Sequence, residues 1–210
     1  MQWVPGWRFE TAVRPKPRFR MSLYRHLLSD RWHAVALAVQ RMHAHDAPVN
    51  ASGRFRIRHG AGWIARAFVR LAGLPPAAED VPTRLTITPT GNGETWLRSF
   101  HGARLVSFQR ALSPGVLAER FGRLELRFRL EVLDGGIVYR QSGAAFCIGR
   151  FRLPLPHWLA PQISAWERPS EDRGCACVSV VVSVPLTGFL IAYEGSMEPE
   201  APRPAEEQAT

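Results

Sequence analysis

Three residues near the middle of the sequence combine a positive charge with two aromatic rings. Trp96, Arg98 and Phe100 occur at every second position, and a β-strand places such residues on one face. If that face is interior, the Arg98 guanidinium needs an anionic partner, because an isolated buried charge is strongly unfavourable. The partner is either Glu119, in the predicted strand 117–121, or the carboxylate of a bound ligand. Trp96, Arg98, Phe100 and Glu119 are therefore the predicted ligand-binding residues.

The sequence offers no motif for nucleophilic or phosphate chemistry. It has no Gly-x-Ser-x-Gly elbow, and residues 143–149 contain neither a P-loop lysine nor a Gly-x-Gly-x-x-Gly motif. Glu119, Glu125, Glu131 and Glu167 could meet in space for two-carboxylate hydrolysis, but their spacing does not favour it, and we expect such residues at the surface. We predict no catalytic residue and no cofactor. The sequence leaves open whether the chain is an enzyme and favours a noncatalytic role.

The histidines and cysteines do not form a metal-binding motif. No His-Glu-x-x-His pattern or other paired-ligand spacing occurs, and the three cysteines lack a Cys-x-x-Cys spacing. We therefore predict no metal site. His43 falls at the end of a predicted helix, where we expect it to interact with the helix dipole.

The elements that must position these residues follow from apolar periodicity. Helical spacing predicts one broken helix or two short helices over residues 22–45, with Ser22 as the capping residue, and a further helix over 63–71. Between them, residues 54–58 alternate as in a strand. About nine strands separated by turns follow from Val81 onward, and the clearest, at residues 123–133, alternates apolar and charged residues five times.

This order predicts an α+β fold that is mainly antiparallel β. Many antiparallel strands must curl, and closure removes exposed edges. We therefore expect a curled sheet or a barrel like those of lipocalins and fatty-acid carriers, with N-terminal helices and one helix after the first strand. The predicted organisation is a loose arm at residues 1–20, a single β-rich domain at 21–195 and a disordered acidic tail at 196–210, with Met21 as an alternative start.

Composition narrows the possible partners and the location. The formal net charge is +9, which admits nucleic-acid binding through an arginine-rich surface. However, Lys16 is the only lysine and the arginines are interleaved with apolar residues, so we rank nucleic acid as an unlikely partner. The chain lacks an apolar run long enough to span a membrane and has no secretory signal, which predicts a cytoplasmic location.

An ordered set of short motifs resembles a known family. The motifs are Ser22-Leu23-Tyr24-Arg25, Trp96-x-Arg98-x-Phe100, Glu119-x-Phe121-Gly122, Leu153-Pro154-Leu155-Pro156 with Leu159-Ala160-Pro161, and Pro185-x-x-Gly188 with Tyr193-x-Gly195. Together they look like the bacterial family of domain of unknown function 4166, over about residues 21–195. The resemblance implies a domain that occurs alone or fused behind an oxidoreductase-like domain related to saccharopine dehydrogenases. It supplies no activity and no catalytic residue.

We predict that the chain binds a small apolar or amphipathic ligand in a barrel-like cavity without converting it. The alternative, from the resemblance, is an accessory or substrate domain that partners a saccharopine-dehydrogenase-like oxidoreductase. Nucleic-acid binding is the lesser alternative.

Overall fold

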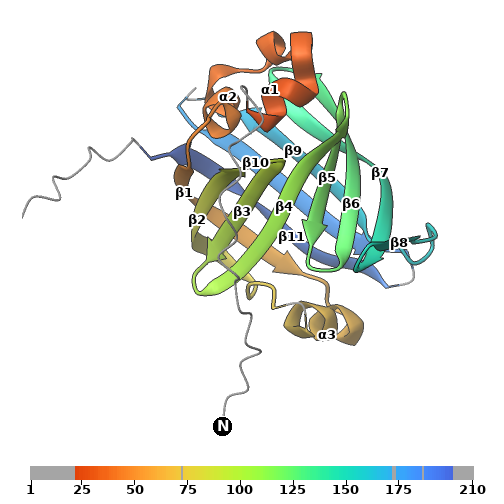
Figure 1. Ribbon diagram of the computed structural model, residues 1–210. Helices are drawn as coiled ribbons and strands as arrows, with labels where there is room; N and C mark the ends of the chain where they lie inside the picture. The colour runs from red at the N-terminus through yellow and green to blue at the C-terminus, as the bar shows by residue number, and fades with distance from the viewer. Residues whose placement is uncertain (1–21, 72, 172–173, 186, 201–210) are drawn as a thin grey trace, which may run out of the picture.

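The computed structural model describes residues 22–71, 73–171, 174–185 and 187–200. The predicted arm at residues 1–20 and the last ten residues of the predicted tail lie outside these ranges. Within them the chain forms three helical segments before the first strand, one helix after it and a long succession of strands (Figure 1). The helices are α1 (Leu23–Leu28), the 3-10 helix η1 (Ser29–Ala34), α2 (Leu37–His43) and α3 (Trp63–Leu71). The strands are β1 (Val49–His59), β2 (Ala78–Thr90), β3 (Gly93–Phe100), β4 (Ala103–Ser113), β5 (Val116–Phe121), β6 (Leu124–Leu133), β7 (Gly136–Ile148), β8 (Phe151–Pro154), β9 (Gln162–Pro169), β10 (Ala176–Val184) and β11 (Gly188–Pro199).

The strands form a closed antiparallel barrel. Their order is β6-β5-β4-β3-β2-β1-β11-β10-β9-β7, and pairing of β6 with β7 closes the ring over these ten strands of the described chain. β8 pairs only with β7 and extends the sheet outside the ring. The prediction of a mainly antiparallel β fold with a carrier-like barrel is confirmed. Ten strands follow α3 where about nine were expected.

Strand alternation sets which side chains face the barrel interior. Along β6, Leu126, Phe128 and Leu130 are buried, whereas Arg129 between the last two is exposed. This is the alternation predicted from the sequence, and it places the apolar side of the strand against the core.

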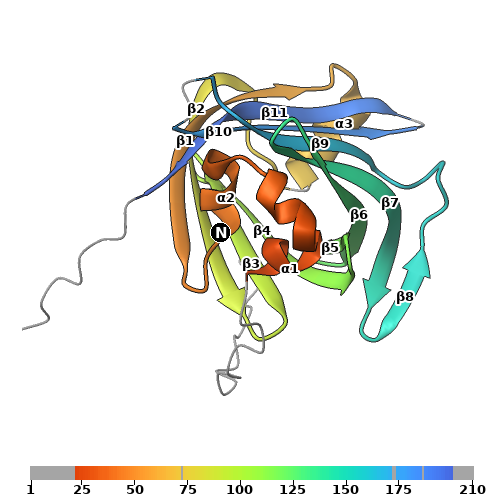
Figure 2. The same ribbon diagram turned by 90° about the horizontal axis from the view of Figure 1, so that it is seen from above.

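The N-terminal helices close one end of the barrel, and α3 lies at the opposite end (Figures 1 and 2). Ser22 caps α1, as predicted, by accepting a hydrogen bond from the Arg25 backbone N–H. The N-terminal helices, here called the helical cap, are held to two turns that connect strands. The Gly115 N–H donates to the Leu27 carbonyl, and the Ala36 N–H donates to the Gly135 carbonyl. The end of the barrel under the N-terminal helices is the capped end, and the end beside α3 is the open end.

The C-terminal boundary of the domain differs from the predicted one. β11 continues past residue 195, and its last residues pair with β1, up to Pro199 opposite Ala51. Residues 154–161 contain a turn in which the Leu159 and Ala160 N–H groups both donate to the Pro156 carbonyl. None of the helices in the described ranges is both long and apolar enough to cross a bilayer.

Candidate functional site

The barrel contains a cavity of about 470 Å³. It reaches Met42 of α2 at the capped end, and at the open end it is bordered by Phe68 of α3 and by Leu74 and Pro75, which follow that helix. Its wall is mostly apolar, and the polar residues that line it are Thr83, Arg98, Gln109, Glu119, Tyr139, Glu167 and Tyr193. Small-molecule sites typically measure about 300–1,000 Å³ and combine an apolar wall with a few polar groups. The cavity has both properties.

Arg98 lies inside the barrel and is bound to a neighbouring carboxylate. Its Nη2 donates to Glu119 Oε1 at 3.0 Å and its Nη1 donates to Ser107 Oγ at 2.9 Å. The Ser107 hydroxyl donates in turn to the same Glu119 oxygen at 2.6 Å. The side chains of Arg98 and Glu119 are only 13% and 10% exposed. Of the two partners that the sequence left open for Arg98, the structure supplies Glu119.

Strand register explains why these groups meet. Trp96 lies opposite Ser107 across β3 and β4, and Gln109 lies opposite Glu119 across β4 and β5, so the interior residues of the three strands are neighbours. The Arg98 guanidinium also lies 4.8 Å from the centre of the Trp96 ring, within range of a cation–π interaction. Burial lowers the pKa of Arg98, but the charge of Glu119, the hydrogen bond to it and the nearby Tyr193 and Tyr24 together raise it by more, so the pKa lies above its ordinary value. The guanidinium therefore stays charged.

The two predicted aromatic residues also line the cavity. Trp96 is buried, and its indole N–H donates to Glu94 Oε2 at 3.2 Å. Phe100 is buried, and its ring packs against Phe55 and Tyr193 with centroid separations of 6.1 and 5.5 Å. The structure thus brings all four sequence-predicted residues to one cavity.

A second polar network joins the helical cap to the barrel wall. His43 Nε2 lies 2.6 Å from Glu167 Oε2, and the Tyr139 hydroxyl donates to Glu167 Oε1 at 2.7 Å. The Tyr24 hydroxyl lies 3.0 Å from that of Tyr139 and donates to Gln109 Oε1 at 2.8 Å. The Tyr24 ring also stacks on the His43 imidazole, with centroids 3.8 Å apart. The chain of contacts runs from α2 to β9 and β7, and through α1 back to β4.

No sequence pattern predicted this second network. The position predicted for His43 at the end of a helix is confirmed. However, its imidazole is buried and contacts Glu167, a partner that was not predicted. The surface placement expected for the glutamates is wrong for Glu119, Glu125 and Glu167, which are buried. Burial raises the pKa of Glu167, but the charge of His43 and hydrogen bonds from His43 and Tyr139 outweigh it, so the pKa lies below its ordinary value.

A comparison with family models identifies the domain. The model described as Domain of unknown function (DUF4166) matches residues 36–197. The chain belongs to this family. The match begins just before α2 and extends into β11. The DUF4166 domain therefore includes every residue of the two interior networks except Tyr24. Neither a curated protein nor a solved structure matches the chain.

Tyr193 is the cavity residue of the DUF4166 domain whose polar group is least engaged. Its hydroxyl makes no hydrogen bond with any described residue, although the ring packs between Phe55 and Phe100. Burial raises the pKa of Tyr193 to about 12, against the opposing influence of Arg98. A neutral phenol that faces the cavity can both donate to and accept from a bound molecule.

Most of the polar side chains that line the cavity take part in hydrogen bonds or ion pairs with each other or with the wall. The two buried carboxylates of the lining are already paired, Glu119 with Arg98 and Glu167 with His43. Among the described residues no three His, Cys, Asp or Glu side chains are grouped so that they could hold a metal ion. The arrangement suits the recognition of a polar group on an otherwise apolar molecule.

Proposed function

We propose that the protein binds a small, neutral, amphipathic molecule inside the barrel and does not convert it. The cavity of about 470 Å³ carries this proposal, because its wall is mostly apolar and a few polar side chains converge in it. The apolar part of the ligand lies toward the open end, near Phe68 and Leu74. Its polar group lies deeper, beside Arg98 and the Tyr193 hydroxyl.

The pairing of the interior charges supports a neutral ligand. Arg98 is the cavity-lining residue that could pair with a ligand carboxylate, but it already forms an ion pair with Glu119. An anionic ligand would leave one of the two carboxylates buried without a partner, at a cost of a few kcal/mol. A hydroxyl or carbonyl group adds no charge and can use the free hydroxyl of Tyr193.

A cavity-filling variant tests whether the barrel interior is the binding site. Ala165 lines the cavity from β9, so Ala165→Trp should abolish binding of a neutral probe such as dodecanol, measured by displacement of the apolar dye N-phenylnaphthylamine. Ser164→Trp is the matched control, because Ser164 is exposed on the outer face of the same strand. Equal binding by the Ala165→Trp variant and the parent protein would place the ligand elsewhere.

A charge variant tests why the ligand is neutral. In the parent protein we expect dodecanol to bind more tightly than dodecanoate. Glu119→Gln removes the partner of Arg98 and should make dodecanoate bind about 10–100-fold more tightly than it binds the parent, because a ligand carboxylate can then take the place of Glu119. Titration calorimetry with both probes checks the preference. An unchanged preference in the variant contradicts the assignment of Arg98 to the ligand's polar group.

The two alternatives from the sequence stay predictions. The described residues offer no observation that favours an oxidoreductase partner. Several exposed arginines on the outer barrel wall are paired with carboxylates, as Arg140 is with Glu131 and Arg54 with Asp80, which does not favour a phosphate-binding stripe.

A further inference from the structure

Exposed apolar side chains gather on one short stretch of the chain, residues 146–159. Six large apolar residues there are exposed to solvent: Phe146, Ile148, Phe151, Leu153, Trp158 and Leu159. Contiguous apolar surface of this kind marks an interaction site in a folded protein. The stretch comprises the end of β7, all of β8 and most of the segment 155–161 that follows.

The hairpin of β7 and β8 places four of these side chains on one face. Phe146 lies opposite Leu153 and Ile148 lies opposite Phe151 in the antiparallel register, so the four form two cross-strand pairs on the same side. Phe146 also lies opposite Leu124 of β6, which lines the cavity. The apolar face therefore continues the inner surface of the barrel beyond its wall. Figures 1 and 2 show the hairpin extending away from the ring of strands.

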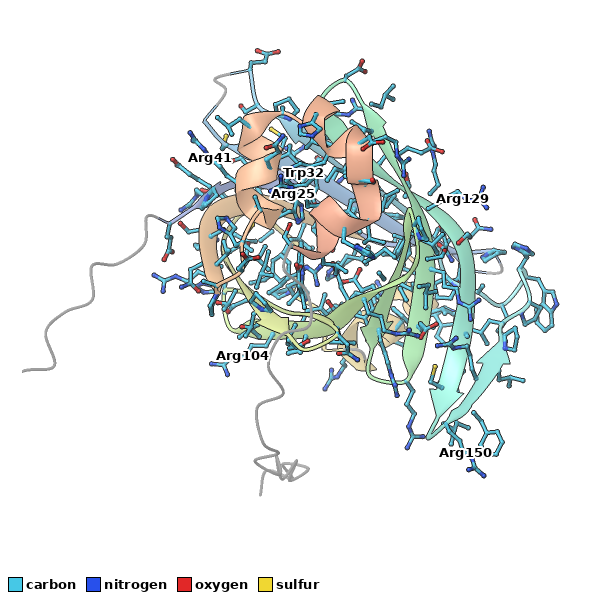
Figure 3. All side chains as sticks on the ribbon, turned by 45° about the horizontal axis from the view of Figure 1, so that its top comes forward. Arg25, Trp32, Arg41, Arg104, Arg129 and Arg150 are labelled. Carbon is cyan, nitrogen blue, oxygen red and sulfur yellow. The ribbon has the colours of Figure 1, made fainter. Side chains whose placement is uncertain are left out.

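The charge around this face is positive. The sequence contains no Asp or Glu between Asp134 and Glu167. On the other side of the hairpin from Phe146 and Leu153, Glu125 is buried under three arginines, Arg110, Arg127 and Arg152, with N···O distances of 3.3, 3.4 and 2.7 Å. Arg150, at the tip of the hairpin, extends outward from the barrel (Figure 3).

The open end carries a second group of the same kind. On α3, Trp63 and Ile64 are exposed together with Arg66 and Arg70. The sequence has no Asp or Glu between Asp46 and Glu79. Figure 1 shows α3 and the tip of the hairpin at the same end of the barrel.

We propose that the protein docks on an anionic membrane surface through the β7–β8 hairpin and the segment 155–161. Exposed tryptophan, phenylalanine and leucine side chains beside Arg150, in a stretch of sequence without Asp or Glu, match the chemistry of the lipid interface, where apolar groups insert and cations meet phosphate. A second copy of the chain fits this face poorly, because both halves of a twofold interface would carry the same excess of positive charge. Docking does not require a ligand in the cavity.

Vesicle co-sedimentation of the full chain tests the proposal. We expect binding to phosphatidylcholine vesicles that contain about a quarter phosphatidylserine, weak binding to vesicles of phosphatidylcholine alone, and loss of binding at high salt. Leu153→Ser should weaken binding about tenfold, because one apolar side chain no longer inserts. Leu37→Ser is its matched control, since both leucines are 63% exposed and Leu37 begins α2 at the capped end.

A second pair of variants tests the charge. Arg150→Gln should weaken binding to the anionic vesicles several-fold, whereas Arg41→Gln, on α2, should not. Failure of the parent protein to bind, or equal effects of the two leucine variants, overturns the proposal. Sedimentation velocity supplies the other outcome, because a dimer that Leu153→Ser dissociates assigns the face to a second copy. Ala165→Trp should keep vesicle binding, so that failure of ligand binding and failure of docking are distinguishable.

Discussion

Replacing Arg98 with methionine should lower the free energy of unfolding by about 3–5 kcal/mol. The variant leaves the Glu119 carboxylate inside the barrel with Ser107 as its remaining hydrogen-bond donor in the described residues. A buried carboxylate without its counter-ion must either stay charged in an apolar environment or take up a proton, and both are costly. Urea denaturation of the parent and the variant at neutral pH measures the difference.

A surface ion pair with the same geometry is the control. Arg140 and Glu131 also approach to 3.0 Å, but their side chains are 61% and 49% exposed. Arg140→Met should therefore cost at most about 1 kcal/mol. Arg98→Met combined with Glu119→Leu should recover most of the lost stability, because the pair is then replaced by apolar side chains. Similar losses in Arg98→Met and Arg140→Met contradict the assignment of Arg98 to a desolvated site.

The sequence pattern was sufficient to predict the fold and one of the two interior networks, the one around Arg98. Alternation over Trp96, Arg98 and Phe100 placed the three on one face, and the cost of a buried guanidinium pointed to Glu119 or a ligand carboxylate as its partner. Both arguments are local, since each uses strand parity and the chemistry of one charge. Gln109 could not have been found in the same way, because a register shift between Ala111 and Ser113, which the short connection between β4 and β5 does not predict, places it opposite Glu119.

The other half of the site depends on contacts that no local pattern encodes. His43 and Glu167 are 124 residues apart, and Tyr24 and Tyr139 are 115 apart. They meet because the helical cap folds into the end of a closed barrel, and the orientation of that cap is set by tertiary contacts such as those of Leu27 with Gly115. A histidine in the last turn of a helix is consistent with an interaction with the helix dipole, and only the packing of the cap shows its partner.

Alkaline pH above about 10 should destabilise and then unfold the protein, and the tyrosines inside the barrel are the reason. Tyr24, Tyr139 and Tyr193 are all the tyrosines of the chain, and all three lie inside the barrel. Burial raises the pKa of Tyr24 and Tyr139 well above 10.0, the ordinary value, and that of Tyr193 to about 12. In the unfolded chain they ionise near pH 10, so stability is complete below that pH and is lost as pH rises toward the folded-state values.

The expected loss is large because the tyrosines act together. Each contributes about 1.4 kcal/mol per pH unit in this range, so the three together contribute about 4 kcal/mol per pH unit. A domain with about 5–15 kcal/mol of stability unfolds within a few such units. Few other groups interfere, because the chain has a single lysine, Lys16, and arginines keep their protons here.

Two optical signals and one variant separate this mechanism from simple surface titration. Tyrosinate absorbance and far-ultraviolet circular dichroism should change in a single transition, since the phenols ionise only when the barrel opens. Tyr193→Phe removes one ionising group without breaking a hydrogen bond to any described residue, so it should reduce the pH dependence by about one third and move the midpoint to higher pH. Ionisation of the tyrosines near pH 10 with the circular dichroism unchanged would mean that water and hydroxide reach the phenols in the folded barrel, and the desolvated interior on which both stability predictions rest would be wrong.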